Sequence, residues 1–424
     1  MVKESNDRIT LYAAYSICVL VAIYSTGLSF SLSLDGNPGK IADSTAAIYF
    51  LAHLLRSQTA QIPKNDTSQE ENGISSIQTP RLVFQMHIPK TGGRTLMIHL
   101  GLWLNTRKEP NCLVAPCCTS REDYTKSVKA SFAANYTCKA ISREISVSGI
   151  QATKEILNIP DNLWYQVSLY RNPINRFVSA VRHNLRQGRC ESMDMTRAVE
   201  IKLNRQCRPV GHDREQAQYF FDFPVSLNEN ETKLDYFVPK DRAVFSRPWP
   251  TSDEMRFHLS NFSFIGITGY MDATNCLLAL QLASLRLMNE SYVLREICNK
   301  SSRVRLDTSL PDDPDNRPLT TQQFMEILLN WHPLDAQTYP MVLESFRRRL
   351  NSTLHDFPQL IHRFQSNLTA VTFEHGVWSK VAMWLRQFQL RSTEENHRLL
   401  FQILDDLDPY EKDVLAPGLK WGKT

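Results

Sequence analysis

Neither sign of charge is in large excess in this sequence of 424 residues. Its 48 lysines and arginines stand against 44 aspartates and glutamates, a formal net charge of +4. A balance this small does not indicate a nucleic-acid partner, and an anionic partner would need a local basic patch. Internal repeats and long low-complexity tracts are also absent. Because 42% of the residues are apolar, the chain can bury a substantial core, in one large domain or two.

A zinc-binding pattern is missing as well. Cys112, Cys117 and Cys118 lie close together but lack the two-plus-two ligand spacing of a zinc site. Cys18 lies in an apolar run, which leaves an even number of cysteines elsewhere: Cys112, Cys117, Cys118, Cys138, Cys190, Cys207, Cys276 and Cys298. We expect these to pair as disulfides in an oxidising compartment, although the spacing does not give the connectivity.

Potential N-glycosylation sites indicate which compartment this is. Eight Asn-x-Ser/Thr sequons without an intervening proline are spread along the polar part of the chain: Asn65, Asn135, Asn230, Asn261, Asn289, Asn299, Asn351 and Asn367. One sequon carries little weight, but eight favour exposure to the lumen of the secretory pathway.

One long uncharged run, residues 9–34, stands between Arg8 and Asp35. Its 26 residues can cross a bilayer with some tilt, because a span needs about 20. The alternative is a cleaved signal peptide, but its apolar core is usually shorter, and no clear small-x-small cleavage site follows this run. We therefore expect an uncleaved signal anchor in type II topology, with a short cytosolic tail and a lumenal body.

These features divide the chain into five segments. A cytosolic tail, the anchor and a stem are expected at 1–8, 9–34 and 35–80, and the second half of the stem is polar, as in a disordered linker. A folded domain is expected at 81–350. A helical extension follows at 351–424, and the sequence assigns no role to it.

Strand and helix patterns alternate within the expected domain. Short apolar runs at 82–88 and 164–170 have the length of buried strands. Helical apolar spacing follows each run, over 95–104 and 174–189, and Pro173 suits the first turn of the second helix. Further helices are predicted at 272–289, 321–331 and 335–350. The alternation predicts an α/β fold with a central parallel sheet flanked by helices, in which ligands lie beyond the carboxyl ends of the strands.

The first strand leads into a glycine-containing turn, Pro89-Lys90-Thr91-Gly92-Gly93-Arg94-Thr95. Gly92 and Gly93 allow the backbone to approach an anion, and the start of the next helix offers unpaired N–H groups. Lys90 supplies a positive charge, and Thr91 and Thr95 supply hydroxyl donors. This is not a Walker A loop, because the lysine precedes the glycines. The alternative is an ordinary glycine turn, but the flanking strand and helix favour anion binding.

His99 lies four residues after Thr95, so the two share one face of the helix, roughly 6 Å apart along its axis. An imidazole there would stand beside the anion, and its pKa suits removal of a proton from a sugar hydroxyl. The alternative is a structural histidine that is hydrogen-bonded in the interior.

The second motif, Arg171-Asn172-Pro173-Ile174-Asn175-Arg176-Phe177-Val178-Ser179, again joins a strand to a helix. Arg171 can bind a phosphate through two hydrogen bonds, and Ser179 lies on the helix that follows. A polar, cationic face is predicted along that helix from residues at three- and four-residue intervals: Arg176, Ser179, Arg182, His183 and Arg186. Such a face is either solvated or in contact with an acidic polysaccharide.

Together, the two motifs resemble the 5′-phosphosulfate loop and the 3′-phosphate loop of Golgi carbohydrate sulfotransferases. They occur in this order, about 80 residues apart, behind a predicted signal anchor. Within that superfamily the sequence is most similar to the heparan sulfate 6-O-sulfotransferases, in residues 87–93 with Thr95 and His99, and in 171–179 with Arg182 and His183. Later segments that are also similar lie at 264–270, 299–303 and 334–339.

The resemblance implies a P-loop-like sulfotransferase fold, with 3′-phosphoadenosine-5′-phosphosulfate (PAPS) as the sulfuryl donor and no metal ion. It implies that the 5′-phosphosulfate is held by Lys90, Thr91, Gly92, Gly93, Arg94 and Thr95. Arg171 and Ser179 would hold the 3′-phosphate, and His99 would be the catalytic base, with Lys90 assisting.

The implied acceptor is a glycosaminoglycan, with 6-O of glucosamine in heparan sulfate as the expected position. Its binding residues would be Arg182, His183 and Arg186, and the enzyme would reside in the Golgi membrane with its catalytic domain in the lumen.

Three positions depart from the family pattern. Arg94 stands where a threonine is usual, Pro89 where the 6-O group often has glutamine, and Asn172 where aspartate is common. The alternatives are a heparan sulfate or uronyl 2-O-sulfotransferase and a non-catalytic glycosaminoglycan-binding glycoprotein. A lumenal nucleotide kinase would share the strand–loop–helix layout, but the sequence lacks a Walker lysine and metal-binding carboxylates.

Overall fold

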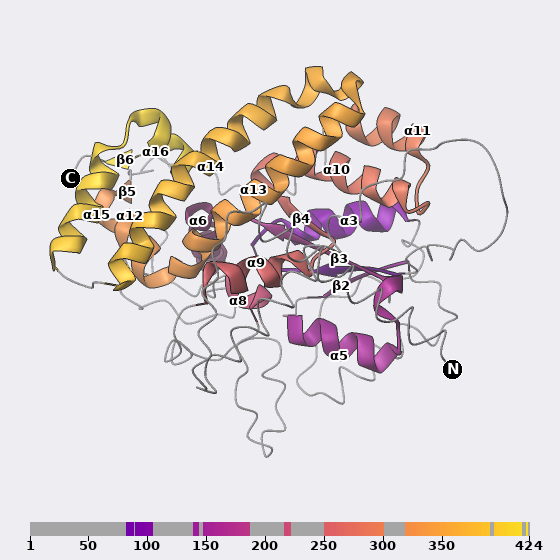
Figure 1. Ribbon diagram of the computed structural model, residues 1–424, viewed down its shortest axis with the longest axis horizontal. Coiled ribbons are helices and arrows are strands. Elements are labelled where there is room, and N and C mark those ends of the chain that lie inside the picture. The colour runs from indigo at the N-terminus through magenta and orange to yellow at the C-terminus, as the bar shows by residue number, and fades with distance from the viewer. Residues whose placement is uncertain are drawn as a thin grey trace, which may run out of the picture. The chain divides into compact units, whose positions relative to one another are not determined.

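Four short parallel strands form a sheet in the order β2 (Ala140–Arg143), β1 (Leu82–Met86), β3 (Trp164–Tyr170) and β4 (Phe264–Ile267). All five residues of β1 are buried, as expected for the central strand of a parallel sheet covered on both faces. The predicted central parallel sheet flanked by helices is therefore confirmed (Figure 1).

The computed structural model describes residues 82–88, 90–104, 139–143, 147–186, 216–221, 250–300, 319–390, 394–417 and 421–422. All of them belong to one compact unit, Ser76–Thr424. The predicted anchor at 9–34 and the stem at 35–80 lie outside the described residues. Within the described part of the chain, no helix combines the length and the apolar character that a membrane crossing requires.

The two predicted strand–turn–helix units form with shifted boundaries. β3 covers the predicted 164–170, whereas β1 ends at Met86, so His87 and Ile88 belong to the turn. The helix after β1 begins earlier than predicted, as α3 (Gly93–Trp103), because Gly92 has the left-handed φ of 81° that ends the turn. The helix after β3, α6 (Pro173–Arg186), begins at the proline as predicted.

The later helices also depart from their predicted lengths. α10 (Met271–Ser284) stops before 289 because Arg286 has a left-handed φ of 57° and its N–H bonds to the Ala283 carbonyl oxygen at 2.8 Å. The predicted helix at 321–331 forms as α12 (Thr321–Glu326) followed by a short π-helix, η7 (Ile327–Trp331).

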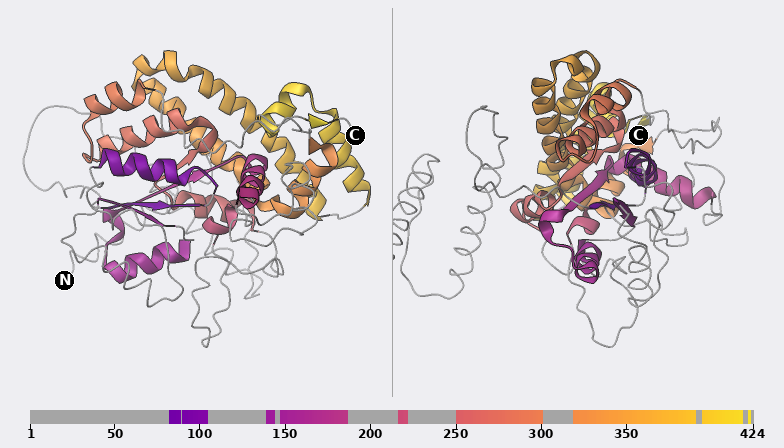
Figure 2. Two further views of the ribbon diagram at one scale, coloured as in Figure 1. Left: turned by 180° about the vertical axis from the view of Figure 1, so that it is seen from behind. Right: turned by 90° about the vertical axis from the view of Figure 1, so that its right-hand side faces the viewer.

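Helices cover both faces of the sheet. α5 (Val147–Leu157) lies on one side of the strands, and α3 and α10 lie on the other (Figures 1 and 2). Beyond them, α13 (Pro333–Asp356) and α14 (Ile361–Leu390) run side by side. α13 extends past the predicted end at 350.

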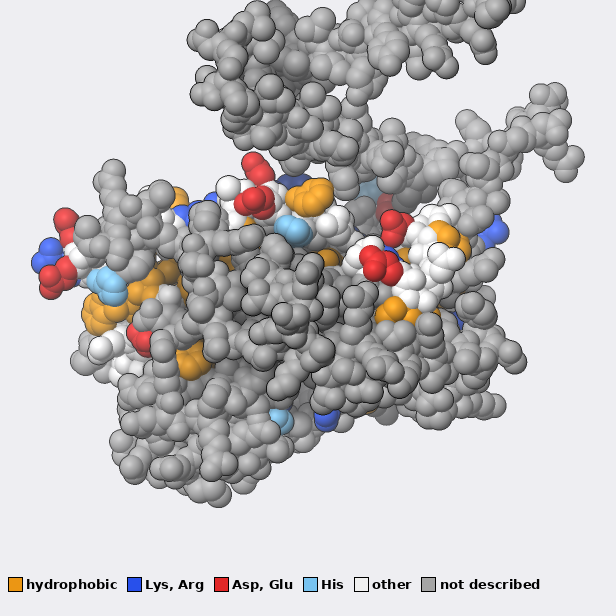
Figure 3. Space-filling model, turned by 90° about the horizontal axis from the view of Figure 1, so that it is seen from below, with side chains coloured by type: hydrophobic (Ala, Val, Ile, Leu, Met, Phe, Trp, Pro, Cys, Tyr) orange, Lys and Arg blue, Asp and Glu red, His pale blue; other side chains and the backbone are white. Residues whose placement is uncertain are grey.

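The C-terminal extension packs against the rest of this unit. It comprises α14, α15 (Glu394–Asp406), α16 (Pro409–Leu415) and a short strand, β6 (Trp421–Gly422), which pairs with β5 (Leu319–Thr320). Trp378 of α14 is fully buried and meets the Tyr339 ring edge-on at 5.3 Å. On the face seen in Figure 3, the described acidic and basic side chains are intermingled.

Asp335 of α13 forms a polar centre within the core. Its carboxylate is fully buried, and its Oδ1 atom accepts hydrogen bonds from the Tyr170 hydroxyl at 2.9 Å and from the Ala217 N–H at 2.7 Å. The Oδ2 atom accepts from the Gln216 N–H at 3.0 Å. One carboxylate thus joins the end of β3 to α13 and to the segment that contains α8 (Ala217–Phe220).

Two basic side chains complete this centre. His332 Nδ1 lies 3.0 Å from Asp335 Oδ2, and Nη1 of the fully buried Arg176 lies 3.9 Å from the same oxygen. Burial opposes ionisation of Asp335, but the hydrogen bond and charge of His332 and the charge of Arg176 hold its pKa below the ordinary value. The carboxylate therefore stabilises the fold in its ionised form.

Replacing Asp335 tests this centre. D335N keeps the size of the side chain but removes the charge that Arg176 faces, and turns amide hydrogens toward existing donors. We expect a loss of roughly 3–5 kcal/mol in the free energy of unfolding, measured by urea denaturation at neutral pH. E296Q, which alters a half-buried carboxylate on η6 (Val293–Cys298) whose partners Arg295 and Lys300 are exposed, is the control and should shift the unfolding midpoint far less. An unfolding curve for D335N that overlays that of the wild type would refute the stabilising role of the ionised Asp335 carboxylate.

Candidate functional site

The turn after β1 is shaped by two left-handed residues. Lys90 has a φ of 67° and Gly92 a φ of 81°, and Gly92 caps the start of α3. A Cβ atom on Gly93 would lie 2.0 Å from Cδ2 of His87, so only glycine fits there. The two predicted glycine positions are therefore required by the geometry of the turn.

The start of α3 leaves backbone donors available. Among the described residues, no acceptor bonds the N–H groups of Gly92, Gly93 or Arg94, whereas the Thr95 N–H bonds to the Gly92 carbonyl at 3.0 Å. Unpaired N–H groups at a helix start favour an anion. The predicted phosphosulfate loop thus has backbone groups that can bind one.

The side chains of this turn have different environments. Thr91 is fully buried and its hydroxyl donates to the Ile88 carbonyl at 2.8 Å, so it closes the turn. Lys90 and Thr95 are half-buried, and Arg94 is exposed. Lys90 and Arg94 are therefore the cations of this loop that reach solvent.

His87 is a buried residue behind the turn, and no role was predicted for it. Its ring lies against Gly93, and burial, with smaller effects from Arg94 and Lys90, lowers its pKa to about 4. Gln85 also holds the backbone at Gly93, because its Nε2 donates to the Gly93 carbonyl at 2.8 Å. A neutral imidazole thus fills the space beneath the first loop.

Arg171 joins the second loop to the first. Its Nη1 donates to the Lys90 carbonyl at 3.1 Å, and Gln216 holds its backbone through two hydrogen bonds of 2.7 Å, to its N–H and to its carbonyl. Burial and the like charges of Arg182 and Arg176 lower the pKa of Arg171 to about 10. The guanidinium remains protonated at neutral pH, in a locally cationic environment that a bound anion would relieve.

The start of α6 differs from the start of α3. Asn172 Oδ1 accepts from the Ile174 N–H at 3.1 Å and the Asn175 N–H at 3.2 Å, and the Asn172 carbonyl accepts from the Arg176 N–H at 2.9 Å. These amides are already satisfied. An anion at the second loop would therefore bind side chains such as Arg171, whereas one at the first loop would meet free amides.

A third loop, after β4, holds the other two together. The Thr268 hydroxyl donates to the Thr91 carbonyl in a short hydrogen bond and lies 3.2 Å from the Tyr170 carbonyl oxygen. Thr268 belongs to the segment 264–270, but no role in the site was predicted for it. A position directly after a strand is the only signal that would have indicated one.

His99 lies within α3, in contact with α10 across the helix interface. It is 7% exposed, its ring centroid lies 5.3 Å from that of Trp103, and its Nδ1 atom has no hydrogen-bond partner among the described residues. Burial lowers its pKa, against smaller opposing effects of Asn275 and Asp272. The imidazole is therefore neutral, as a general base must be, although its Nδ1 atom is itself buried.

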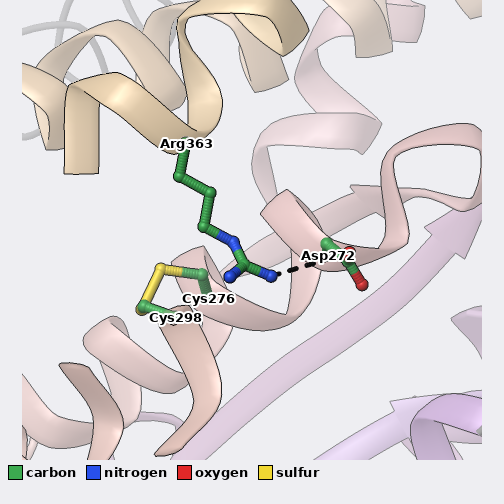
Figure 4. Close-up of a disulfide and its surroundings, with 4 residues drawn as sticks. All are labelled: Asp272, Cys276, Cys298 and Arg363. Carbon is green, nitrogen blue, oxygen red and sulfur yellow. Dashed lines mark ion pairs between the residues drawn. A yellow bond between two sulfur atoms is a disulfide. The ribbon is translucent and has the colours of Figure 1, made fainter. Parts of the chain in front are cut away.

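Two contacts hold α10 in place beside His99. Asp272 pairs with Arg363 of α14 at 3.7 Å, and a disulfide between Cys276 and Cys298 ties α10 to η6 (Figure 4). This pair is compatible with the expected disulfides. The other six cysteines that were expected to pair lie outside the described residues.

The remaining predicted residues lie on α6. Ser179, Arg182 and His183 are half-buried, and Arg182 is near enough to Arg171 to lower its pKa. The side chain of Arg186 lies outside the described residues. In the described ranges, no group of three or more His, Cys, Asp or Glu side chains is arranged to hold a metal ion.

No protein-family model matches this sequence, and no significant match is found among the curated proteins or the solved structures. The roles of the site residues therefore rest on their geometry and on the sequence motifs.

The buried His87 makes stability depend on pH. An unfolded chain binds a proton here near pH 6.5, but the folded protein does so only near pH 4. His87 thus contributes fully to stability above pH 6.5, and up to about 3 kcal/mol is lost as the pH falls from 6.5 to 4. H87N, which cannot titrate, should lose less stability across this interval in urea denaturation. H355N, at an exposed position on α13, should keep the wild-type dependence, and an unaltered slope in H87N would contradict the prediction.

Proposed function

We propose that the protein transfers a sulfuryl group from PAPS to a hydroxyl of a glycosaminoglycan, with 6-O of glucosamine in heparan sulfate as the acceptor position. The observation that carries the proposal is the hydrogen bond from Arg171 to the Lys90 carbonyl. It joins two strand-to-helix loops at the carboxyl edge of adjacent parallel strands, where α/β proteins bind ligands.

The residues at these loops suit a donor with phosphates at both ends. The amides of Gly92–Arg94, which have no acceptor in the described part of the chain, and the charge of Lys90 would hold the 5′-phosphosulfate. Arg171, in its cationic surroundings, would hold the 3′-phosphate together with Ser179. PAPS supplies the activated sulfuryl group, with 3′,5′-adenosine bisphosphate as the leaving group.

In the proposed reaction, His99 accepts the proton of the acceptor hydroxyl as the hydroxyl oxygen bonds to sulfur. The bond from sulfur to the bridging phosphate oxygen breaks, and its electron pair leaves with that oxygen. Lys90 and the loop amides stabilise the growing negative charge. Arg182 and His183, with Arg186, would bind the acidic acceptor.

The same proposal assigns the protein to the Golgi membrane, anchored by residues 9–34 with its catalytic domain in the lumen. The departure at Asn172 does not weaken it, because an asparagine serves there as the helix cap of α6. The departure at Asn172 therefore no longer favours the alternative of a non-catalytic glycosaminoglycan-binding glycoprotein.

A transfer assay with full-length protein in detergent tests the proposal. Radiolabelled PAPS is offered with heparan sulfate, desulfated heparins and chondroitin, and the products are analysed as disaccharides. We expect label at 6-O of glucosamine. Label at another position would keep the enzyme class but reject the acceptor assignment, and no transfer without PAPS binding would reject both.

His99 should be needed for turnover but not for donor binding. H99A removes the base, so we expect kcat to fall by roughly 10²–10⁴-fold while the affinity for 3′,5′-adenosine bisphosphate stays within about twofold. H362A, an exposed position on α14, is the matched control and should behave as the wild type. Wild-type turnover in H99A would remove His99 from the mechanism.

A further inference from the structure

The C-terminal extension contacts the second loop through Asn172. The side-chain amide of Asn172 donates to the carbonyl oxygens of Leu415 at 3.0 Å and Val414 at 3.4 Å. These carbonyls lie in the last turn of α16, where backbone acceptors lack partners within the helix. Since its Oδ1 caps the start of α6, Asn172 caps two helices at once, one on each side of the loop.

A second contact comes from α14. Glu374 is 5% exposed, and its two carboxylate oxygens accept from the hydroxyls of Tyr270 at 2.7 Å and Tyr339 at 2.8 Å. Tyr270 lies two residues after Thr268, in the third loop. Lys380 of α14 in turn pairs with Glu411 of α16 at 2.8 Å. The extension therefore braces both loops that accompany the phosphosulfate loop.

We propose that α14 and α16 are part of the donor site, and that Asn172 is the positioning residue through which they hold Arg171 toward the 3′-phosphate. This inference rests on the proposed function. It gives α14 and α16, to which the sequence assigned no role, a part in donor binding that is exerted through Asn172.

The choice of asparagine follows from its surroundings. Aspartate or serine at 172 would cap α6 equally well. Aspartate, however, would turn a carboxylate oxygen toward the Val414 and Leu415 carbonyls, and serine is too short to reach them. N172D and N172S therefore separate the two functions, because both keep the cap and lose the contacts of the amide with α16 and with Glu374 of α14.

The test uses full-length protein, with calorimetric titration of 3′,5′-adenosine bisphosphate and initial rates at varied PAPS. Loss of the link should raise the dissociation constant and the KM for PAPS on the order of tenfold in both variants. Because the chemistry is untouched, kcat at saturating PAPS should stay within about twofold. N175D is the matched control: it adds the same charge in the same turn of α6, keeps Asn172, and should change the KM far less than N172D.

A fourth variant covers the case in which changes at 172 prevent folding. L415A leaves residue 172 unchanged but removes a buried side chain of α16 at the residue whose carbonyl accepts from Asn172, and it should also raise the dissociation constant. Wild-type affinity in the folded variants, or a fall in kcat at unchanged KM, would overturn this inference alone. Failure of the wild type to bind 3′,5′-adenosine bisphosphate would instead reject the proposed function, and this inference with it.

Discussion

The ionised carboxylate of Asp335 is the interaction on which the rest of the structure depends. It is fully buried, yet it bonds to the end of β3 through Tyr170, to the segment at 216–217, and to His332. Removing such a charge from water is costly, so it persists only because several donors and the nearby Arg176 surround it. Gln216, held by this carboxylate, in turn holds the backbone of Arg171. The buried carboxylate of Asp335 therefore fixes, through Gln216, the position of Arg171, the residue expected to bind the 3′-phosphate.

The three loops at the carboxyl edge of the sheet have complementary properties. The first offers amides that have no acceptor among the described residues, and the second a guanidinium among like charges. The third offers the Thr268 hydroxyl, which ties the first loop to the end of β3. Such an arrangement suits a ligand with anionic groups at two ends, one at the amides and one at the guanidinium.

Local sequence patterns predicted those parts of the fold that depend on neighbouring residues. Apolar runs, glycines and Pro173 indicated the two strand–turn–helix units, because a buried strand and a helix start have signals within a few residues. Contacts between distant residues had no such signal. Asn172 meets Leu415 across 243 positions, and Tyr170 meets Asp335 across 165. His87 was missed for a related reason, because its burial depends on Gly93 and the packing around it.

The central claim is that the first and second loops form one site for a donor with phosphates at both ends. The most direct measurement compares the dissociation constants of 3′,5′-adenosine bisphosphate and adenosine 5′-monophosphate in the wild type and in R171M. The account predicts that the wild type prefers the bisphosphate by roughly 10–100-fold, the worth of charge-assisted hydrogen bonds, and that R171M loses most of this preference. Equal affinity of the wild type for the two nucleotides, or an undiminished preference in R171M, would contradict it.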